Sequence, residues 1–151
     1  VYSPVLNVCY FASLGKGAWC QTGSSQPEKI NVSSFDLFKP RVVASRSHSG
    51  AEVDKFCQIL SEKAGHPLET ISMGSALKVC VVARGDADVY PRFGLTSEWD
   101  TCASHCVLNE AGGRLVDYQG NEFIYNKNSL LNPWFLAFGD DNFDWVSIYR
   151  D

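Results

Sequence analysis

The chain alternates segments that have the two-residue periodicity of β-strands with segments that have the longer periodicity of amphipathic helices. This alternation constrains the fold more than any other feature. Helices are expected at residues 49–64, 75–84, 101–111 and from 140 or 141 to 149. Strands are expected at residues 5–12, 18–22, 29–32, 41–45, 68–72, 87–92, 113–116, 122–124 and 135–138. We therefore predict an α/β fold, with a layered mixed β-sheet flanked by helices.

Length and charge exclude several classes of protein. A chain of 151 residues with 45% apolar residues is long and apolar enough for one compact domain. The formal net charge is −4 and lysine and arginine form no run, so we expect no nucleic acid polymer as a partner. No apolar stretch approaches the roughly 20 residues of a membrane helix, and the first residues do not resemble a signal peptide. We therefore expect no membrane span.

Six cysteines are scattered through the expected strands and helices. This distribution favours free thiols that pack as small apolar groups in a reducing compartment over a disulfide framework. Cys102, His105 and Cys106 could hold a soft metal, but the fourth ligand that structural zinc usually needs is missing, so buried thiols are the favoured interpretation. We expect a cytoplasmic protein, with association with the inner face of a membrane as the alternative.

The segment 97–113 places one carboxylate, Asp100, near the N-cap of the expected helix at 101–111. Asp100 can cap this helix by accepting a backbone N–H, which is the commoner role of aspartate there. Alternatively, it can bind a hard cation while the free N–H groups and the positive end of the helix dipole face an anion. Trp99 is expected to be a buried packing anchor that holds Asp100 in place.

Other candidate residues lie where strands and helices meet. Ser75 and Lys78 share a face of the first turn of the helix at 75–84. A lysine there opposes the helix dipole, and an anion that neutralises both would explain its placement. The alternative is that the Lys78 side chain extends from a buried helix to solvent.

Arg92 and His48 each lie at the end of an expected strand. The guanidinium fork of Arg92 suits a phosphate, and the alternative is a salt bridge to one of three nearby carboxylates. These carboxylates belong to Asp86, Asp88 and Glu98. His48 lies at an edge where open α/β sheets bind ligands, and the alternative is a solvated loop histidine.

The ordered set of these segments resembles one known family. Trp-Asp at 99–100, a helix with small residues and Glu-Ala-Gly-Gly at 110–113 resemble the C-terminal signature of the inositol monophosphatase superfamily of magnesium-dependent phosphatases. Gly-Ser-Ala-Leu-Lys at 74–78 and Asp-Val-Tyr-Pro-Arg-Phe-Gly at 88–94 resemble its bacterial 3'(2'),5'-bisphosphate nucleotidase branch, as do segments 1–7, 45–48 and 131–133. This resemblance covers almost the whole chain and implies the C-terminal domain of an αβαβα fold.

The resemblance also implies a reaction of sulfur metabolism. It is the Mg²⁺-dependent hydrolysis of the 3'(2')-phosphate of nucleoside 3'(2'),5'-bisphosphates, such as 3'-phosphoadenosine 5'-phosphate, to AMP and phosphate. In that scheme Asp100 is catalytic and binds the metal, His48 packs against the adenine, and the substrate is also bound by Ser75, Lys78 and Arg92. The alternatives are an inositol or fructose-bisphosphate phosphatase of the same superfamily and a noncatalytic nucleotide-binding fragment.

Two motifs of the family do not occur in residues 1–151. They are a paired-glutamate segment and an Asp-Pro-(Ile/Leu)-Asp-Gly-Thr motif, which in family members precede the matching region, supply most metal ligands and position the attacking water. We therefore expect residues 1–151 to be the C-terminal α/β domain of a longer phosphatase, with its N-terminal metal-binding half as a partner. The chain alone is expected to be inactive, because a lone carboxylate cannot assemble a site for several metal ions.

Overall fold

The computed structural model describes residues 1–45 and 50–150. Four strands form an antiparallel sheet in the order β1 (Tyr2–Ser3), β2 (Val8–Ser13), β3 (Gly17–Thr22) and β4 (Glu28–Ile30). The other five form a second sheet in the order β6-β5-β7-β9-β8; they are β5 (Arg41–Ser45), β6 (Glu69–Met73), β7 (Val89–Arg92), β8 (Arg114–Asp117) and β9 (Phe135–Phe138). The helices are α1 (Ala51–Ala64), α2 (Leu77–Ala83), α3 (Glu98–Glu110) and α4 (Trp145–Arg150).

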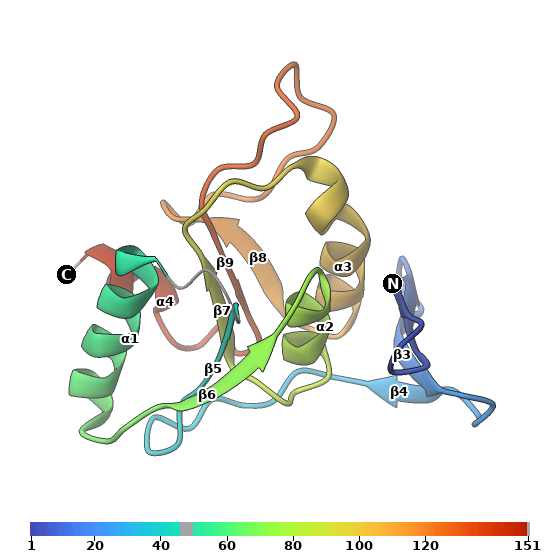
Figure 1. The fold of residues 1–151 in the computed structure, drawn as a ribbon, viewed down its shortest axis with the longest axis horizontal. Coiled ribbons are helices and arrows are strands. Elements are labelled where there is room, and N and C mark those ends of the chain that lie inside the picture. Colours follow the sequence, from blue (N-terminus) through green and yellow to red (C-terminus); the bar gives the residue numbers. More distant parts are fainter. Residues whose placement is uncertain (46–49, 151) are drawn as a thin grey trace.

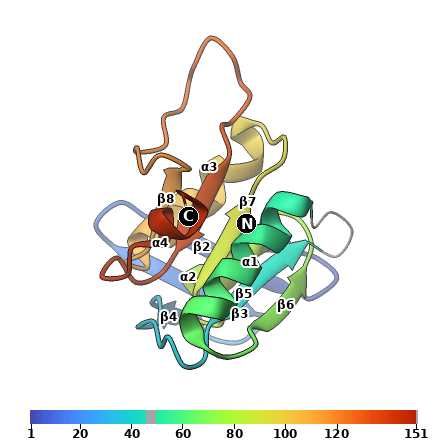
Figure 2. The same cartoon turned by 90° about the vertical axis from the view of Figure 1, so that its left-hand side faces the viewer.

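These elements stack in layers. Helices α2 and α3 lie between the two sheets, and α1 and α4 cover the outer face of the five-stranded sheet (Figure 1). Figure 2, which is turned to that side, shows α1 in front of this sheet. In the five-stranded sheet, β5 is parallel to β6 and β7, whereas β9 is antiparallel to β7 and β8. The α/β prediction with a mixed sheet is therefore confirmed.

Two apolar cores hold the layers together, one on each face of the five-stranded sheet. Strand β9 contributes to both because alternate residues of a strand point to opposite faces. Phe135 and Ala137 pack in the core around α2 and α3, while Leu136 and Phe138 pack in the core beneath α1 and α4. A strand covered on both faces is apolar throughout, which explains why its bounds at 135–138 were predicted correctly.

The double glycine after α3 serves the packing of this helix. Gly112 has a φ of +94°, a left-handed conformation that glycine adopts without strain. At Gly113, a Cβ atom would lie only 2.6 Å from the carbonyl oxygen of Phe138 in β9. The second glycine therefore lets the chain leave the helix in close contact with the five-stranded sheet.

Several predicted bounds are wrong for identifiable reasons. Strand β2 begins at Val8 because residues before it form a turn in which Asn7 has a φ of 49°. The expected strand at 122–124 is reduced to one bridge between Val116 and Glu122, and a long loop follows. Helix α4 begins at Trp145, and its cap is Asp144, whose Oδ1 atom accepts the N–H of Ser147 at 3.1 Å.

The carboxylate of Asp140 is engaged elsewhere. It accepts the backbone N–H groups of Phe35 at 3.0 Å and Asn142 at 2.9 Å. Asp140 therefore joins the end of β9 to the segment before β5, and the prediction that Asp140 or Asp141 caps the last helix is wrong.

The cysteines differ from expectation in one region. All six carry free thiols, and Cys20 and Cys80 are buried as expected. Cys102 and Cys106 are exposed, so the expectation of buried thiols in this cluster is wrong. Helix α3 turns Ser104, together with other small and apolar residues, toward its neighbours, and this leaves the two thiols on the opposite side. None of the helices in the described part of the chain is long and apolar enough to span a membrane.

Candidate functional site

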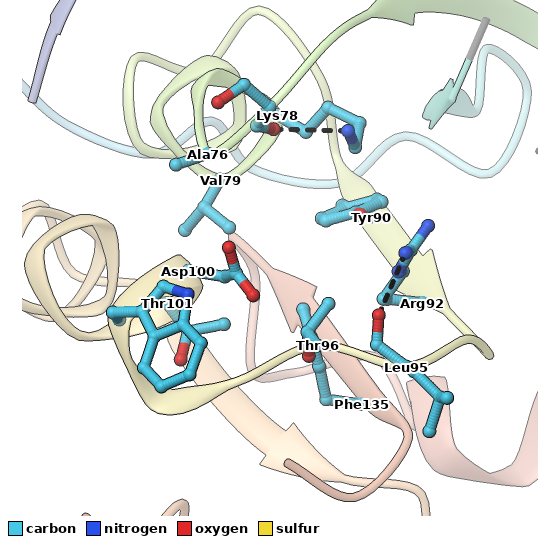
Figure 3. A pocket seen from close by; sticks show the side chains of 12 residues that line it. Ala76, Lys78, Val79, Tyr90, Arg92, Leu95, Thr96, Asp100, Thr101 and Phe135 are labelled. Atoms are coloured by element: carbon cyan, nitrogen blue, oxygen red, sulfur yellow. Dashed lines mark hydrogen bonds between the residues drawn. The ribbon is translucent and has the colours of Figure 1, made fainter. Parts of the chain in front are cut away.

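One cavity brings together residues that lie far apart in the sequence. Ser75, Lys78, Arg92 and Asp100 line a space of about 400 Å³ formed by the start of α2, the end of β7 and the first turn of α3. Figure 3 shows the side chains of Lys78, Arg92 and Asp100 around its open centre. His48 lies outside the described residues, so its predicted role in binding adenine stays a prediction.

Asp100 both supports its helix and faces the cavity. Helix α3 begins at Glu98 after the N-cap Ser97, so Asp100 is the third helical residue and the predicted start at 101 is wrong. The Ser97 N–H donates to Oδ2 of Asp100 at 2.7 Å, the reciprocal bond of a capping box. Among the described residues, no hydrogen bond engages the other oxygen of this carboxylate. The capping role therefore leaves one oxygen for another partner.

Lys78 is buried, with only 4% of its surface exposed. Its Nζ atom donates to the carbonyl oxygen of Ser75 at 3.1 Å and lies 5.1 Å from the centre of the Tyr90 ring. The interpretation that this side chain extends to solvent is therefore wrong. Burial lowers the pKa of Lys78, and the nearby charge of Arg92 lowers it further. An anion in the cavity would act in the opposite direction and raise the pKa of Lys78.

Ser75 precedes α2 instead of belonging to its first turn. The helix begins at Leu77, and Ser75 has a φ of 59°, which is unusual for a residue with a side chain. Its carbonyl oxygen accepts a hydrogen bond from the Nζ atom of Lys78 at 3.1 Å. In this structure the main chain of Ser75 thus positions Lys78 at the cavity.

Arg92 has no carboxylate partner among the described residues. Each of the three carboxylates that the sequence suggested as its partner binds another cation; the pairs are Asp86 with Arg84, Asp88 with Arg41 at 2.6 Å, and Glu98 with Lys127 at 2.5 Å. The Arg92 Nη2 atom donates to the carbonyl oxygen of Leu95 at 3.2 Å, and its buried Nε atom has no partner in the described part of the chain. The salt-bridge interpretation of Arg92 is therefore wrong.

Aromatic residues complete the cavity. Tyr90 packs edge-on against Phe135, with ring centres 5.7 Å apart, and burial raises the pKa of Tyr90 to about 12, so its hydroxyl stays protonated. Tyr90 was missed by the sequence analysis. Strand periodicity could have found it, because Tyr90 lies two residues before Arg92 on the same face of β7.

Trp99 contradicts its predicted role. It is 72% exposed at the cavity instead of buried as a packing anchor. The side chain before Asp100 turns outward because the first turn of α3 directs Thr101, which is only 2% exposed, into the protein. Asp100 is therefore held by its bond to Ser97, and no packing by Trp99 is needed.

A complete metal centre is not present in the described part of the chain. No group of three or more His, Cys, Asp or Glu side chains there could hold a metal ion. A hard cation such as Mg²⁺ needs about six oxygen ligands, and Asp100 offers one unengaged carboxylate oxygen. Asp100 thus fits one ligand position, and other ligands must come from elsewhere.

The fold and the cavity agree with comparisons to known proteins. Residues 1–134 match the inositol monophosphatase family, and the chain belongs to this family. It is 43% identical over 136 residues to the 3'(2'),5'-bisphosphate nucleotidase CysQ of Escherichia coli K12. The aligned region covers 89% of this chain and 52% of the relative. Its identity to the CysQ of Haemophilus influenzae is 32% over 152 residues, covering 99% and 55%.

A solved structure gives the same result. CysQ from Bacteroides thetaiotaomicron, a bacterial member of the inositol monophosphatase family, has a TM-score of 0.80 and 38% identity, covering 91% of this chain and 56% of that chain. These matches confirm the predicted family, branch and fold class. The chain spans about half the length of the curated relatives it matches, 52% in the case of the E. coli protein.

Proposed function

We propose that this chain forms the C-terminal, substrate-binding half of a magnesium-dependent 3'(2'),5'-bisphosphate nucleotidase. The reaction is the hydrolysis of 3'-phosphoadenosine 5'-phosphate, or a similar nucleoside bisphosphate, to AMP and phosphate. One observation carries the proposal: the cavity holds two cations, Lys78 and Arg92, and neither is paired with a carboxylate among the described residues. The names of the related proteins support the same activity.

Each site residue predicted from the sequence has a role in this proposal. Lys78 and Arg92 hold the phosphate that does not react, because a buried amine and a guanidinium without a carboxylate partner favour a multiply charged anion. Ser75 positions Lys78 and contacts the ribose or its phosphate, and His48 packs against the adenine. The unengaged oxygen of Asp100 is one ligand of Mg²⁺. When bound, such ions polarise a phosphoryl oxygen and lower the pKa of water.

The remaining metal ligands belong, in this proposal, to an N-terminal half that precedes the matching region in relatives. The length of the relatives supports this arrangement, since the chain corresponds to 52% of the E. coli protein.

The free thiols of all six cysteines support a reducing compartment such as the cytoplasm. The absence of a metal cluster from the described residues favours the alternative of a noncatalytic nucleotide-binding domain for this chain taken by itself.

A substrate comparison on the complete enzyme tests the proposal. Phosphate release would be measured with and without Mg²⁺ for 3'-phosphoadenosine 5'-phosphate, inositol monophosphate and fructose 1,6-bisphosphate. We expect the highest kcat/KM for the nucleoside bisphosphate, because its second phosphate and base use the two cations and the histidine. A preference for either sugar phosphate would instead assign the protein to another branch of the superfamily. Nucleotide binding without hydrolysis would support the noncatalytic alternative.

A further inference from the structure

A long loop holds the start of α3. The loop of residues 118–134 joins β8 to β9 and extends beyond the N-terminal end of α3 (Figures 1 and 2). The Glu98 N–H donates to the carbonyl oxygen of Leu130 at 2.9 Å, and the Asn132 N–H donates to that of Thr96 at 2.8 Å. These main-chain bonds join the loop to the residues on both sides of the N-cap.

The side chain of Asn132 makes the central contacts. It is 7% exposed, and the two N–H groups of its Nδ2 atom are shared among three acceptors within hydrogen-bond distance: the Thr96 hydroxyl at 3.1 Å, the Ser97 carbonyl at 2.7 Å and the Thr101 hydroxyl at 3.2 Å. The short distance to a carbonyl requires a donor, so the amide nitrogen, not the oxygen, must face Ser97. One side chain thus links the loop, the N-cap and the first turn of α3.

The other end of this amide is not satisfied. The Oδ1 atom of Asn132 is buried and has no hydrogen-bond partner in the described part of the chain. The amide group is therefore held through its nitrogen, and all three contacts of this nitrogen are to residues 96–101 around the start of α3.

These contacts end at Asp100. Asn132 fixes the carbonyl of Ser97, and the N–H of the same residue donates to Oδ2 of Asp100 at 2.7 Å. Both backbone polar groups of Ser97 therefore have partners: the loop donates to its carbonyl oxygen, and its N–H donates to the carboxylate that faces the cavity. A rotation of this residue would turn the Asp100 carboxylate away from its present direction.

We infer that Asn132 is a positioning residue that sets the direction of the Asp100 carboxylate through Ser97 and Thr101. This inference rests on the proposed function for its effect on turnover. Its structural part, the ordering of the first turn of α3, does not depend on the identity of the substrate.

The test uses Asn132→Asp in the complete enzyme, because this change keeps the shape of the side chain and replaces the donor by an oxygen. Backbone amide hydrogen exchange at residues 97–101 should become roughly tenfold or more faster, while exchange in β5, β7 and β9 stays near that of the wild type. We expect kcat to fall roughly tenfold and the Mg²⁺ concentration for half-maximal activity to rise, with a smaller change in KM.

Asn142→Asp is the matched control. Its Nδ2 atom also donates to an oxygen, Oδ1 of Asp140 at 2.8 Å, but it lies outside the cavity, before α4. Equal losses in the two variants, or unchanged exchange at residues 97–101 in Asn132→Asp, would overturn the inference. If the wild-type enzyme hydrolyses no nucleoside bisphosphate, the proposed function fails, and hydrogen exchange still decides whether Asn132 orders the turn.

A second pair of variants covers the case in which Asn132→Asp does not fold. Thr101→Val removes one acceptor of the Asn132 amide without a large change in shape, whereas Thr101→Ser keeps the hydroxyl. Faster exchange at residues 97–101 in the valine variant, restored in the serine variant, is the expected result. Identical exchange in both variants would contradict the inference.

Discussion

At the scale of single residues, the geometry of Asp100 allows both the helix cap that the structure shows and the metal binding that we propose. One oxygen accepts the N–H of Ser97, and the other is not engaged by any described residue. The sequence left capping and metal binding as alternatives. The geometry makes them compatible, because a carboxylate has two oxygens and the cap uses one.

Asp100→Asn in the complete enzyme should separate these roles. The amide oxygen can still accept the Ser97 N–H, so the loss of stability should stay near the 0.3–1 kcal/mol that a charge in the first turn contributes, as a rough estimate. Turnover should fall at least about tenfold and the Mg²⁺ requirement should rise, because the side chain proposed to bind the cation loses its negative charge. Thermal unfolding and Mg²⁺ titrations of activity measure the two effects. Unchanged activity and Mg²⁺ dependence would mean that Asp100 is only a cap.

Arg92 is the second residue with a decisive substitution. Arg92→Ala should lower kcat/KM for both substrates to different extents. The loss for 3'-phosphoadenosine 5'-phosphate should be about tenfold to a hundredfold larger than the loss for inositol monophosphate, because only the former has a second phosphate. This range corresponds to roughly 1.5–3 kcal/mol for a charged hydrogen bond. Arg84→Ala is the control, since Arg84 pairs with Asp86 outside the cavity. If both substrates lose the same factor, Arg92 holds either the fold or the phosphate that both substrates share.

At the scale of elements, α3 connects the cavity to the four-stranded sheet. Its last residue, Glu110, accepts the backbone N–H of Gly15 at 2.9 Å with one carboxylate oxygen and that of Gly17 at 2.8 Å with the other. Gly15 lies in the turn between β2 and β3, and Gly17 is the first residue of β3. The carboxylate of Glu110 therefore fastens the C-terminal end of α3 to this turn.

Glu110→Gln should weaken this connection in a pH-dependent way. The N–H groups of Gly15 and Gly17 lower the pKa of Glu110 below its ordinary value of 4.5. Because the folded-state pKa is the lower one, the stabilisation is fully present above about pH 5 and is lost as the pH falls through the folded-state pKa. Glutamine can accept with only one oxygen, so the variant should be less stable than the wild type at neutral pH.

Urea unfolding at several pH values measures this effect. The difference between the unfolding free energies of wild type and Glu110→Gln should shrink as the pH falls through the lowered pKa of the wild-type carboxylate, where this group becomes protonated. Glu28→Gln, in the edge strand β4 of the same sheet, is the control for removing a surface charge. A difference that does not change with pH would contradict this role of Glu110.

At the scale of the whole molecule, the layers place the proposed substrate-binding groups and one proposed metal ligand at one cavity. We predict that residues 1–151 alone release no appreciable phosphate from 3'-phosphoadenosine 5'-phosphate with Mg²⁺. The physical reason is that the described residues contain no cluster of three metal-binding side chains. The complete enzyme, assayed in parallel, is the positive control. Comparable rates for the two proteins would show that the chain contains a full catalytic centre.

Local sequence patterns determined much of the fold. The predicted strands at 41–45 and 135–138 match β5 and β9, because strand periodicity and apolar runs depend on which residues face a core. The ordered motifs also identified the family, which the match to residues 1–134 confirms. Each periodic run and each single motif is formed by residues close together in the chain, although the family became clear only from the order of several motifs along it.

The starts of helices depended on side-chain contacts that local patterns do not record. Ser97 and Asp100 begin α3 three residues before the predicted start at 101, and Asp144 begins α4 after the aspartates expected to cap it. In each case several residues could accept a backbone N–H. Which of them does so depends on whether its carboxylate is already engaged, as that of Asp140 is by Phe35.

The cavity itself was decided only by the tertiary structure. The sequence singled out Lys78, Arg92 and Asp100 one by one, but their meeting depends on the packing of α2, β7 and α3. Only the structure excludes the salt bridges expected for Arg92, because it shows that the three candidate carboxylates pair with other cations. The exposure of side chains also depended on the tertiary structure. Trp99 and Cys102 were expected to be buried, but both lie on the surface. Burial and ion pairing depend on neighbours that are distant in sequence, and those neighbours are set by the fold.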